Sequence, residues 1–100
     1  MQLLQGDCIE EMSKLDDDSL DLIIADPPYF RVLKDKWDNQ WRDFDDYLAW
    51  LEKVLVQIQR ILKTNGSVYL FCWPAYSAEI QMMMSRHLNV LSEIWCFNLL

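Results

Sequence analysis

The sequence predicts an α/β fold in which a mostly parallel sheet is flanked by helices. Strand-like and helix-like apolar patterns alternate along the 100 residues, and residues 43–63 carry a long amphipathic stripe. An apolar run at residues 20–25 is followed directly by Asp26-Pro27-Pro28-Tyr29. Strands that alternate with helices are usually parallel and joined by helical crossovers. A polar loop after such a strand lies at the carboxyl edge of the sheet, where ligands bind in open α/β folds.

The first quarter of the chain predicts a strand, a helix and a second strand. Residues 3–5 (Leu-Leu-Gln) favour a short strand that ends before Gly6 and Asp7. Residues 8–15 place apolar side chains on one helical face, with Asp7 as the N-cap and Glu10 as its capping-box partner. An acidic turn at residues 16–19 then leads into the strand at residues 20–25, which we expect to be buried.

The rest of the chain predicts two helices and two further strands. Residues 30–42 show little periodicity, whereas residues 43–63 repeat apolar side chains at i, i+3, i+4 and i+7. Asp43 is the predicted N-cap of that helix, and Gly66 is the predicted stop. We expect a buried strand at residues 67–73, a helix from Pro74 to about residue 87, and a final strand at residues 90–97.

The composition indicates a folded, acidic and soluble chain. With 52% hydrophobic residues the chain is too apolar to be disordered, and its length fits one small domain or a piece of a larger one. No apolar run approaches the ~20 residues that span a bilayer, and the N-terminus lacks signal-peptide features, so we expect a cytoplasmic protein with no membrane partner. A net charge of −7 argues against a general nucleic-acid-binding surface, although it does not exclude DNA as a substrate.

Metal and disulfide chemistry find little support in the sequence. Cys8, Cys72 and Cys96 are widely spaced and form no CxxC pair, and His87 is the only histidine. We therefore expect reduced thiols and no metal site.

The Asp26-Pro27-Pro28-Tyr29 loop has the chemistry to bind an amine on an aromatic ring. The two prolines fix φ and remove two backbone N–H groups, so the loop presents carbonyl oxygens without competing donors. The Asp26 carboxylate and the Pro27 carbonyl match the two hydrogens of an –NH2 group, and Tyr29 offers a flat ring for stacking. Accepting both hydrogens would free the nitrogen lone pair to attack an electrophilic methyl group. A base in duplex DNA must leave the stack to reach such a loop.

Ordinary structural roles compete with these functional ones. An Asx turn before the prolines would also use Asp26, and an N-cap explains Asp7 fully. Trp37 and Trp41 are more often packing residues beneath an irregular loop than contacts to a base. The position of Asp26 between a buried-type strand and Tyr29 is what favours a catalytic loop.

Four segments together resemble the DNA amino-methyltransferases, which methylate adenine N6 or cytosine N4 with S-adenosylmethionine. The segments are Gly6-Asp7, the strand at residues 21–25, Asp26-Pro27-Pro28-Tyr29, and residues 60–69 with the sequence RILKTNGSVY. Their order resembles the permuted subgroup, in which the catalytic loop lies near the N-terminus and the glycine motif of the cofactor site comes later. The resemblance implies a partial Rossmann-like methyltransferase fold.

The resemblance also implies a role for each candidate site residue. Asp26-Pro27-Pro28-Tyr29 would form the catalytic loop, with Tyr29 stacked on an adenine flipped out of double-stranded DNA. The cofactor S-adenosylmethionine would contact Asp7, Cys8 and Asp26, while Phe30 and Trp37 would join Tyr29 in binding the base. Asp rather than Ser as the first loop residue favours adenine over cytosine in this family. A related loop that begins with Asn occurs in enzymes that methylate glutamine in proteins.

The chain departs from the family in what it lacks. Only Gly6 and Gly66 are present, so the glycine-rich cofactor turn is missing, as is a target-recognition region. Residues 1–100 therefore resemble the N-terminal part of a methyltransferase catalytic domain, with an open edge beside the strand at residues 20–25.

Two hypotheses about function follow. In the first, the chain is the catalytic half of an adenine-specific DNA methyltransferase that needs the remainder of its chain or a self-association partner. In the second, it is a non-catalytic remnant that acts as an interaction module. Under both we expect no methyl transfer by residues 1–100 alone.

Overall fold

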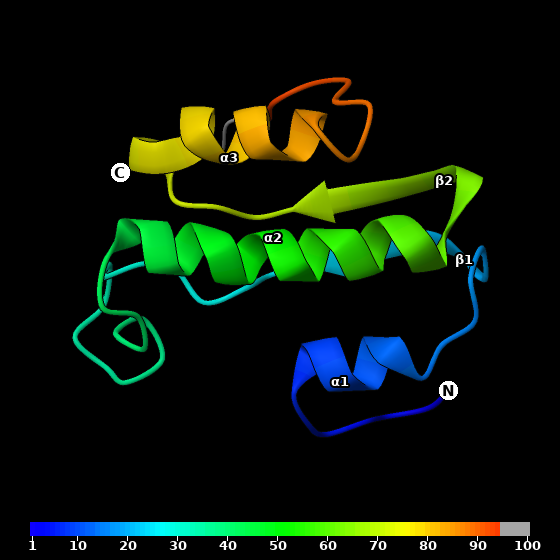
Figure 1. Ribbon diagram of the computed structural model, residues 1–100, viewed down its shortest axis with the longest axis horizontal. Helices are drawn as coiled ribbons and strands as arrows, with labels where there is room; N and C mark the ends of the chain where they lie inside the picture. Colours follow the sequence, from blue (N-terminus) through cyan, green and yellow to red (C-terminus); the bar gives the residue numbers. More distant parts are fainter. Residues whose placement is uncertain (95–100) are drawn as a thin grey trace, which may run out of the picture.

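The structure, a computed structural model, describes residues 1–94 and has the predicted α/β class. Its elements are α1 (Cys8–Ser13), β1 (Leu20–Ala25), α2 (Phe44–Ile61), β2 (Leu62–Leu70), the 3-10 helix η1 (Pro74–Tyr76) and α3 (Ser77–Ser85). β1 and β2 form a two-stranded parallel sheet, and α2 is the crossover between them (Figure 1). Parallel neighbours require such a crossover, because a tight hairpin can join only antiparallel strands. None of the helices in the described residues is long and apolar enough to cross a membrane.

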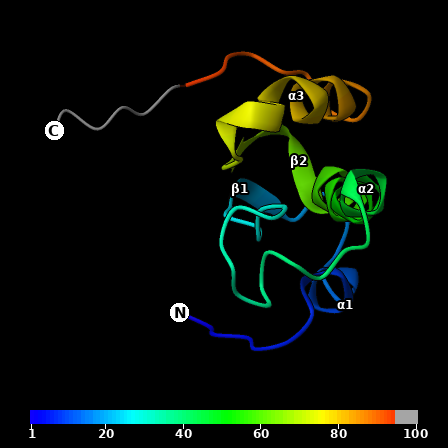
Figure 2. The same cartoon turned by 90° about the vertical axis from the view of Figure 1, so that its left-hand side faces the viewer.

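Helix α2 forms the centre of the hydrophobic core. Its buried side chains recur at the predicted helical spacing: Tyr47, Leu51, Val54, Leu55, Ile58 and Ile61. α3 contributes Ile80 and Met83 to the same cluster, and the sheet packs Ile23 and Val68 against it. Figure 2, in which α2 is seen nearly end-on, shows α3 above α2 and α1 below it. The amphipathic stripe of α2 therefore organises the other elements around one helix.

The start of α2 confirms the sequence prediction, whereas its end does not. The Asp43 carboxylate accepts the amide of Asp46 at 2.8 Å and so caps the helix. α2 ends at Ile61, and the chain passes directly into β2, so Gly66 is a strand residue rather than a helix stop. A Cβ at Gly66 would lie 3.0 Å from the carbonyl oxygen of Asp21. The glycine therefore lets β2 approach β1 closely.

Two predicted strands are wrong for the part of the chain that the structure describes. Residues 3–5 have no regular structure, and Leu3 and Leu4 are 88% and 58% exposed. Residues 90–94 form no strand, and residues 95–97 of the same prediction lie outside the described residues. A strand must pair its backbone groups with a neighbour, and the two-stranded sheet of residues 1–94 provides neither segment with one.

The remaining boundaries shift by a few residues. α1 ends at Ser13 rather than at residue 15, and β2 spans Leu62–Leu70 rather than residues 67–73. The helix predicted from Pro74 divides into η1 and α3, which ends at Ser85.

One face of the sheet is uncovered, so the prediction of a buried β1 is only half right. Ile23 and Ala25 pack against the core cluster, but the alternate side chains point to the opposite face. On that face Leu22 is 54% exposed, Ile24 66% and, from β2, Tyr69 54%. A group of large apolar side chains exposed side by side usually marks a surface that another polypeptide segment or a ligand covers.

Candidate active site

The Asp26-Pro27-Pro28-Tyr29 loop begins where β1 ends, as the sequence predicted. β1 ends at Ala25, whose carbonyl accepts the amide of Phe71 at 2.9 Å, one residue beyond β2. Residues 71–73 therefore leave the sheet directly beside the loop. The two segments lie at one edge because the strands are parallel (Figure 1).

Asp26 and Tyr29 are linked through their side chains. The Tyr29 hydroxyl donates a long hydrogen bond of 3.5 Å to Asp26 Oδ1. Burial raises the pKa of the Tyr29 phenol, and the negative charge of Asp26 raises it further, so the phenol stays protonated at neutral pH. Asp26 itself is exposed and remains accessible to a ligand.

Trp73 is an aromatic residue of this edge that the sequence analysis missed. Its ring centroid lies 6.4 Å from that of Tyr29, with the two ring planes inclined by 42°. Trp73 is 43% exposed, so the pair presents aromatic surface to solvent beside Asp26. A signal was available in the sequence: Trp73 follows one parallel strand as Asp26 follows the other, and such strand ends meet at the same edge.

The backbone of the loop is held by three side chains from three different segments. Consecutive residues 28, 29 and 30 each use one backbone group. The hydroxyl of Tyr47 donates to the Pro28 carbonyl at 2.9 Å, the amide of Tyr29 donates to Asp38 Oδ1 at 3.0 Å, and the amide of Phe30 donates to the Tyr76 hydroxyl at 2.8 Å. Within residues 1–94 no donor binds the Pro27 carbonyl, so this oxygen can accept a hydrogen bond from a ligand.

Tyr47 is the most buried of these three side chains. It is 0% exposed, and burial above all raises the pKa of its phenol, followed by the nearby hydroxyl of Tyr76. Tyr47 therefore stays protonated and keeps donating to the loop.

Phe30 lies between the loop and the core. Its ring centroid is 5.6 Å from that of Phe44 and 5.8 Å from that of Tyr47, so one side of the ring is used in packing. Phe30 also lines a hollow of about 630 Å³ with Leu33, Trp73 and Tyr76 among its other walls. The hollow is open to solvent, and its lining is mostly aromatic and aliphatic.

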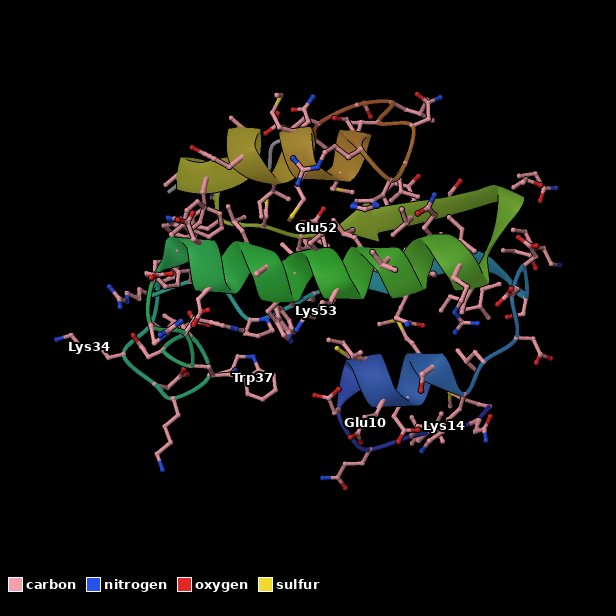
Figure 3. The ribbon with its side chains drawn as sticks, in the orientation of Figure 1. Glu10, Lys14, Lys34, Trp37, Glu52 and Lys53 are labelled. Atoms are coloured by element: carbon pink, nitrogen blue, oxygen red, sulfur yellow. The ribbon has the colours of Figure 1, made fainter. Side chains whose placement is uncertain are left out.

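Trp37 extends from the irregular loop into open space (Figure 3). It is 64% exposed, and within residues 1–94 it makes no aromatic pair. Trp41 instead packs into the structure, with its ring centroid 4.8 Å from Tyr47 and 5.1 Å from Trp50. The packing alternative therefore describes Trp41 and not Trp37.

Asp7 and Cys8 lie at the start of α1 rather than at the end of a strand. The Asp7 carboxylate accepts the amide of Glu10 at 3.1 Å, which confirms the predicted N-cap. Partial burial raises the pKa of the Cys8 thiol, and the charge of Asp7 adds to the effect. Because the strand at residues 3–5 is absent, Asp7 is not carried to the carboxyl edge of the sheet, and the described hydrogen bonds do not join it to Asp26.

The predicted contacts of Asp7, Cys8 and Asp26 with S-adenosylmethionine stay a prediction, and within residues 1–94 no hydrogen bond joins Asp7 to Asp26. Such a ligand needs a carboxylate for its ribose and an apolar slot for its adenine. The hollow beside Phe30 supplies apolar walls, but its lining includes no carboxylate. The described residues likewise contain no group of three or more His, Cys, Asp or Glu side chains placed to hold a metal ion.

A parallel sheet with a helical crossover and an Asp-Pro-Pro-Tyr loop at its carboxyl edge is the arrangement that the resemblance to amino-methyltransferases leads us to expect. Comparison with known proteins then identifies the family. The model of the DNA methylase family matches residues 20–98, and the chain belongs to this family of N6/N4 DNA methyltransferases.

Three curated relatives show how much of a whole protein the chain represents. The type II methyltransferase M.HinfI of Haemophilus influenzae is 37% identical over 83 residues, covering 68% of this chain and 23% of its own. M.BamHI of Bacillus amyloliquefaciens is 32% identical, over 88% of this chain and 21% of its own. The DNA adenine methyltransferase YhdJ of Escherichia coli K12 is 36% identical, over 96% of this chain and 33% of its own. The chain thus spans between a fifth and a third of the length of these relatives.

Proposed function

We propose that this chain is the substrate-binding part of an enzyme that transfers a methyl group from S-adenosylmethionine to the N6 amine of adenine in double-stranded DNA. The observation that carries the proposal is the loop at the end of β1. Its four consecutive residues present an exposed Asp26 carboxylate, a Pro27 carbonyl that accepts no hydrogen bond within residues 1–94, and the Tyr29 ring. Family membership supplies the reaction class.

The loop would act by holding the amine in a reactive geometry. The adenine N6 lone pair is delocalised into the ring and is a poor nucleophile. Hydrogen bonds from both N6 hydrogens, one to Asp26 and one to Pro27, would favour a tetrahedral nitrogen whose lone pair points at the methyl group. The two prolines contribute no N–H that would compete for these acceptors.

The base would reach the loop by leaving the duplex. Tyr29 would stack on the flipped adenine, since aromatic stacking partly replaces the stacking energy lost in the helix. Trp73, 6.4 Å from Tyr29, extends the aromatic surface on which the base can lie. Phe30, which lines the hollow beside Trp73, and Trp37 complete the proposed base-binding group.

Adenine is the preferred target for two reasons. The first residue of the loop is Asp, which favours adenine in this family, and a relative with 36% identity, YhdJ, is named as a DNA adenine methyltransferase. Cytosine N4 is the alternative target, since the family includes both activities.

The whole enzyme is needed for the reaction. S-adenosylmethionine supplies an electrophilic methyl group, and Asp26 would contact it from this chain, with Asp7 and Cys8 on the α1 side. The remaining contacts and the basic DNA-binding surface come from the rest of the enzyme, because the net charge of this chain is −7. The uncovered face with Leu22, Ile24 and Tyr69 is a surface for that remaining polypeptide. Taken alone, residues 1–100 would be an inactive interaction module.

A chimera tests the proposal directly. The segment of YhdJ that this chain matches, 33% of YhdJ, is replaced by residues 1–100. The purified chimera is incubated with unmethylated DNA and S-adenosylmethionine, and the digested nucleosides are analysed by mass spectrometry. We expect N6-methyldeoxyadenosine from the chimera and no methylated nucleoside from residues 1–100 alone.

The control is YhdJ itself, carried through the same steps. A chimera that unfolds cooperatively and binds S-adenosylmethionine, yet methylates no adenine or methylates cytosine, would refute the proposed function.

A further inference from the structure

We infer that Asp38 is a positioning residue for methyl transfer: its buried carboxylate fixes the backbone behind Tyr29 and so sets where the Tyr29 ring and Asp26 stand. The inference rests on the function proposed above, but it concerns a residue outside the Asp26-Pro27-Pro28-Tyr29 motif.

Asp38 differs from every other acidic side chain in the described residues. It is 3% exposed and is the only buried polar or charged residue among them. Removing a carboxylate from water is unfavourable unless hydrogen bonds replace the lost hydration. Both oxygens of Asp38 have such bonds: Oδ1 accepts the amide of Tyr29 at 3.0 Å, and Oδ2 accepts the amide of Leu33 at 2.9 Å.

These bonds tie together the turn that follows the catalytic loop. The backbone carbonyl of Asp38 accepts the amide of Arg31 at 2.7 Å, so one residue binds three amides between positions 29 and 33. Arg31 has a positive φ of 52°, which an L residue adopts only when its surroundings hold it there. The hydrogen bond from the Arg31 amide to Asp38 stabilises this conformation from across the turn.

Asp38 works with the two tyrosines that bind the neighbouring residues. Tyr47 is fixed by α2 and Tyr76 by η1, whereas Asp38 comes from the irregular segment between β1 and α2. Its own amide donates to Asp35 Oδ1 at 3.3 Å, a contact that an asparagine at position 35 would keep. Without Asp38 the amides of Tyr29 and Leu33 lose their partner, and Tyr29 is the residue that would stack on the base.

Asp38→Asn in the YhdJ chimera is the test of this role. Asparagine has the same size but offers one carbonyl oxygen and one –NH2 group, so one of the two amides faces a donor. We expect the single-turnover rate of methyl transfer to fall by about 10- to 100-fold, because small misplacements of reacting groups have effects of this order. The dissociation constants for DNA and S-adenosylmethionine should change less than about twofold, since a positioning role acts on the chemical step.

The matched control is Asp35→Asn. Asp35 lies in the same segment and also accepts two backbone amides, those of Trp37 and Asp38, but it is exposed and does not contact Tyr29. Asparagine keeps the oxygen that both amides use, so the rate should stay within about twofold of the unsubstituted chimera.

Amide hydrogen exchange in the 100-residue chain provides a readout independent of activity. In Asp38→Asn the amides of Tyr29 and Leu33 should exchange at least about tenfold faster, while the buried α2 amide of Leu55 keeps its protection. A uniform loss of protection, or an unchanged rate of methyl transfer in Asp38→Asn, would overturn the positioning role. An unsubstituted chimera that is inactive counts against the proposed function instead, and hydrogen exchange then decides whether Asp38 anchors the loop.

Discussion

Replacing Asp26 by alanine should abolish most of the activity of the YhdJ chimera, with the rate of methyl transfer reduced on the order of 10³-fold. Asp26 would accept one of the two N6 hydrogens, and a preorganised polar group aimed at the reacting atoms contributes effects of this size. The substitution also removes the acceptor of the Tyr29 hydroxyl, 3.5 Å away. Because Asp26 is exposed, the fold should tolerate its replacement by alanine.

Asp21→Ala is the matched control for Asp26→Ala. Asp21 lies on β1, the strand that precedes Asp26; it is exposed and pairs with Lys63 at 3.1 Å on the surface, away from the loop. Its removal should change the rate less than about twofold, because surface ion pairs contribute little. Radioactive methyl incorporation into DNA measures both variants, and an Asp26→Ala chimera that keeps a tenth of the activity would contradict the assigned role.

Leu55→Ala should lower the free energy of unfolding of the 100-residue chain by about 3 kcal/mol. Leu55 is 0% exposed at the centre of the core cluster, so alanine leaves a cavity as well as removing buried apolar surface. A small domain has only about 5–15 kcal/mol of stability in total, so the loss is a large share of it.

Val56→Ala is the control for this change. Val56 is the next residue of α2 but is 46% exposed, and alanine favours the helix, so stability should change by less than about 0.5 kcal/mol. Urea denaturation followed by circular dichroism measures both variants. An equal loss of stability in Leu55→Ala and Val56→Ala would mean that α2 does not direct Leu55 into the core and Val56 towards solvent.

The parts of the fold that depend on local pattern were predictable from the sequence. The stripe of α2 and its cap at Asp43 need only the spacing of residues within one segment. The end of α2 was not predictable in the same way, because Leu62 enters β2 without a loop and no stop residue marks the change. The strands predicted near the two ends are absent from residues 3–5 and 90–94, because a strand exists only with a partner and a partner is not a local property.

In the candidate site, too, the features set by local sequence could be predicted, and those that depend on distant residues could not. Asp26-Pro27-Pro28-Tyr29 is contiguous, so its chemistry and its place after a strand could be inferred from the residues. Asp38 could not be inferred, because its contact with Tyr29 depends on how residues 30–37 turn back. The bond between Phe30 and Tyr76 joins residues that are 46 positions apart. Local sequence pattern carries no signal for contacts of this kind.

The position of the target amine in a complex decides whether the loop after β1 binds the base. A crystal structure of the chimera with a DNA duplex and a non-reactive analogue of the methyl donor would give the distance between adenine N6 and Asp26. We expect a flipped adenine against Tyr29, with N6 within about 3.2 Å of both an Asp26 carboxylate oxygen and the Pro27 carbonyl oxygen. A flipped base whose amine is bound by other residues, with Asp26 facing solvent, would contradict this expectation.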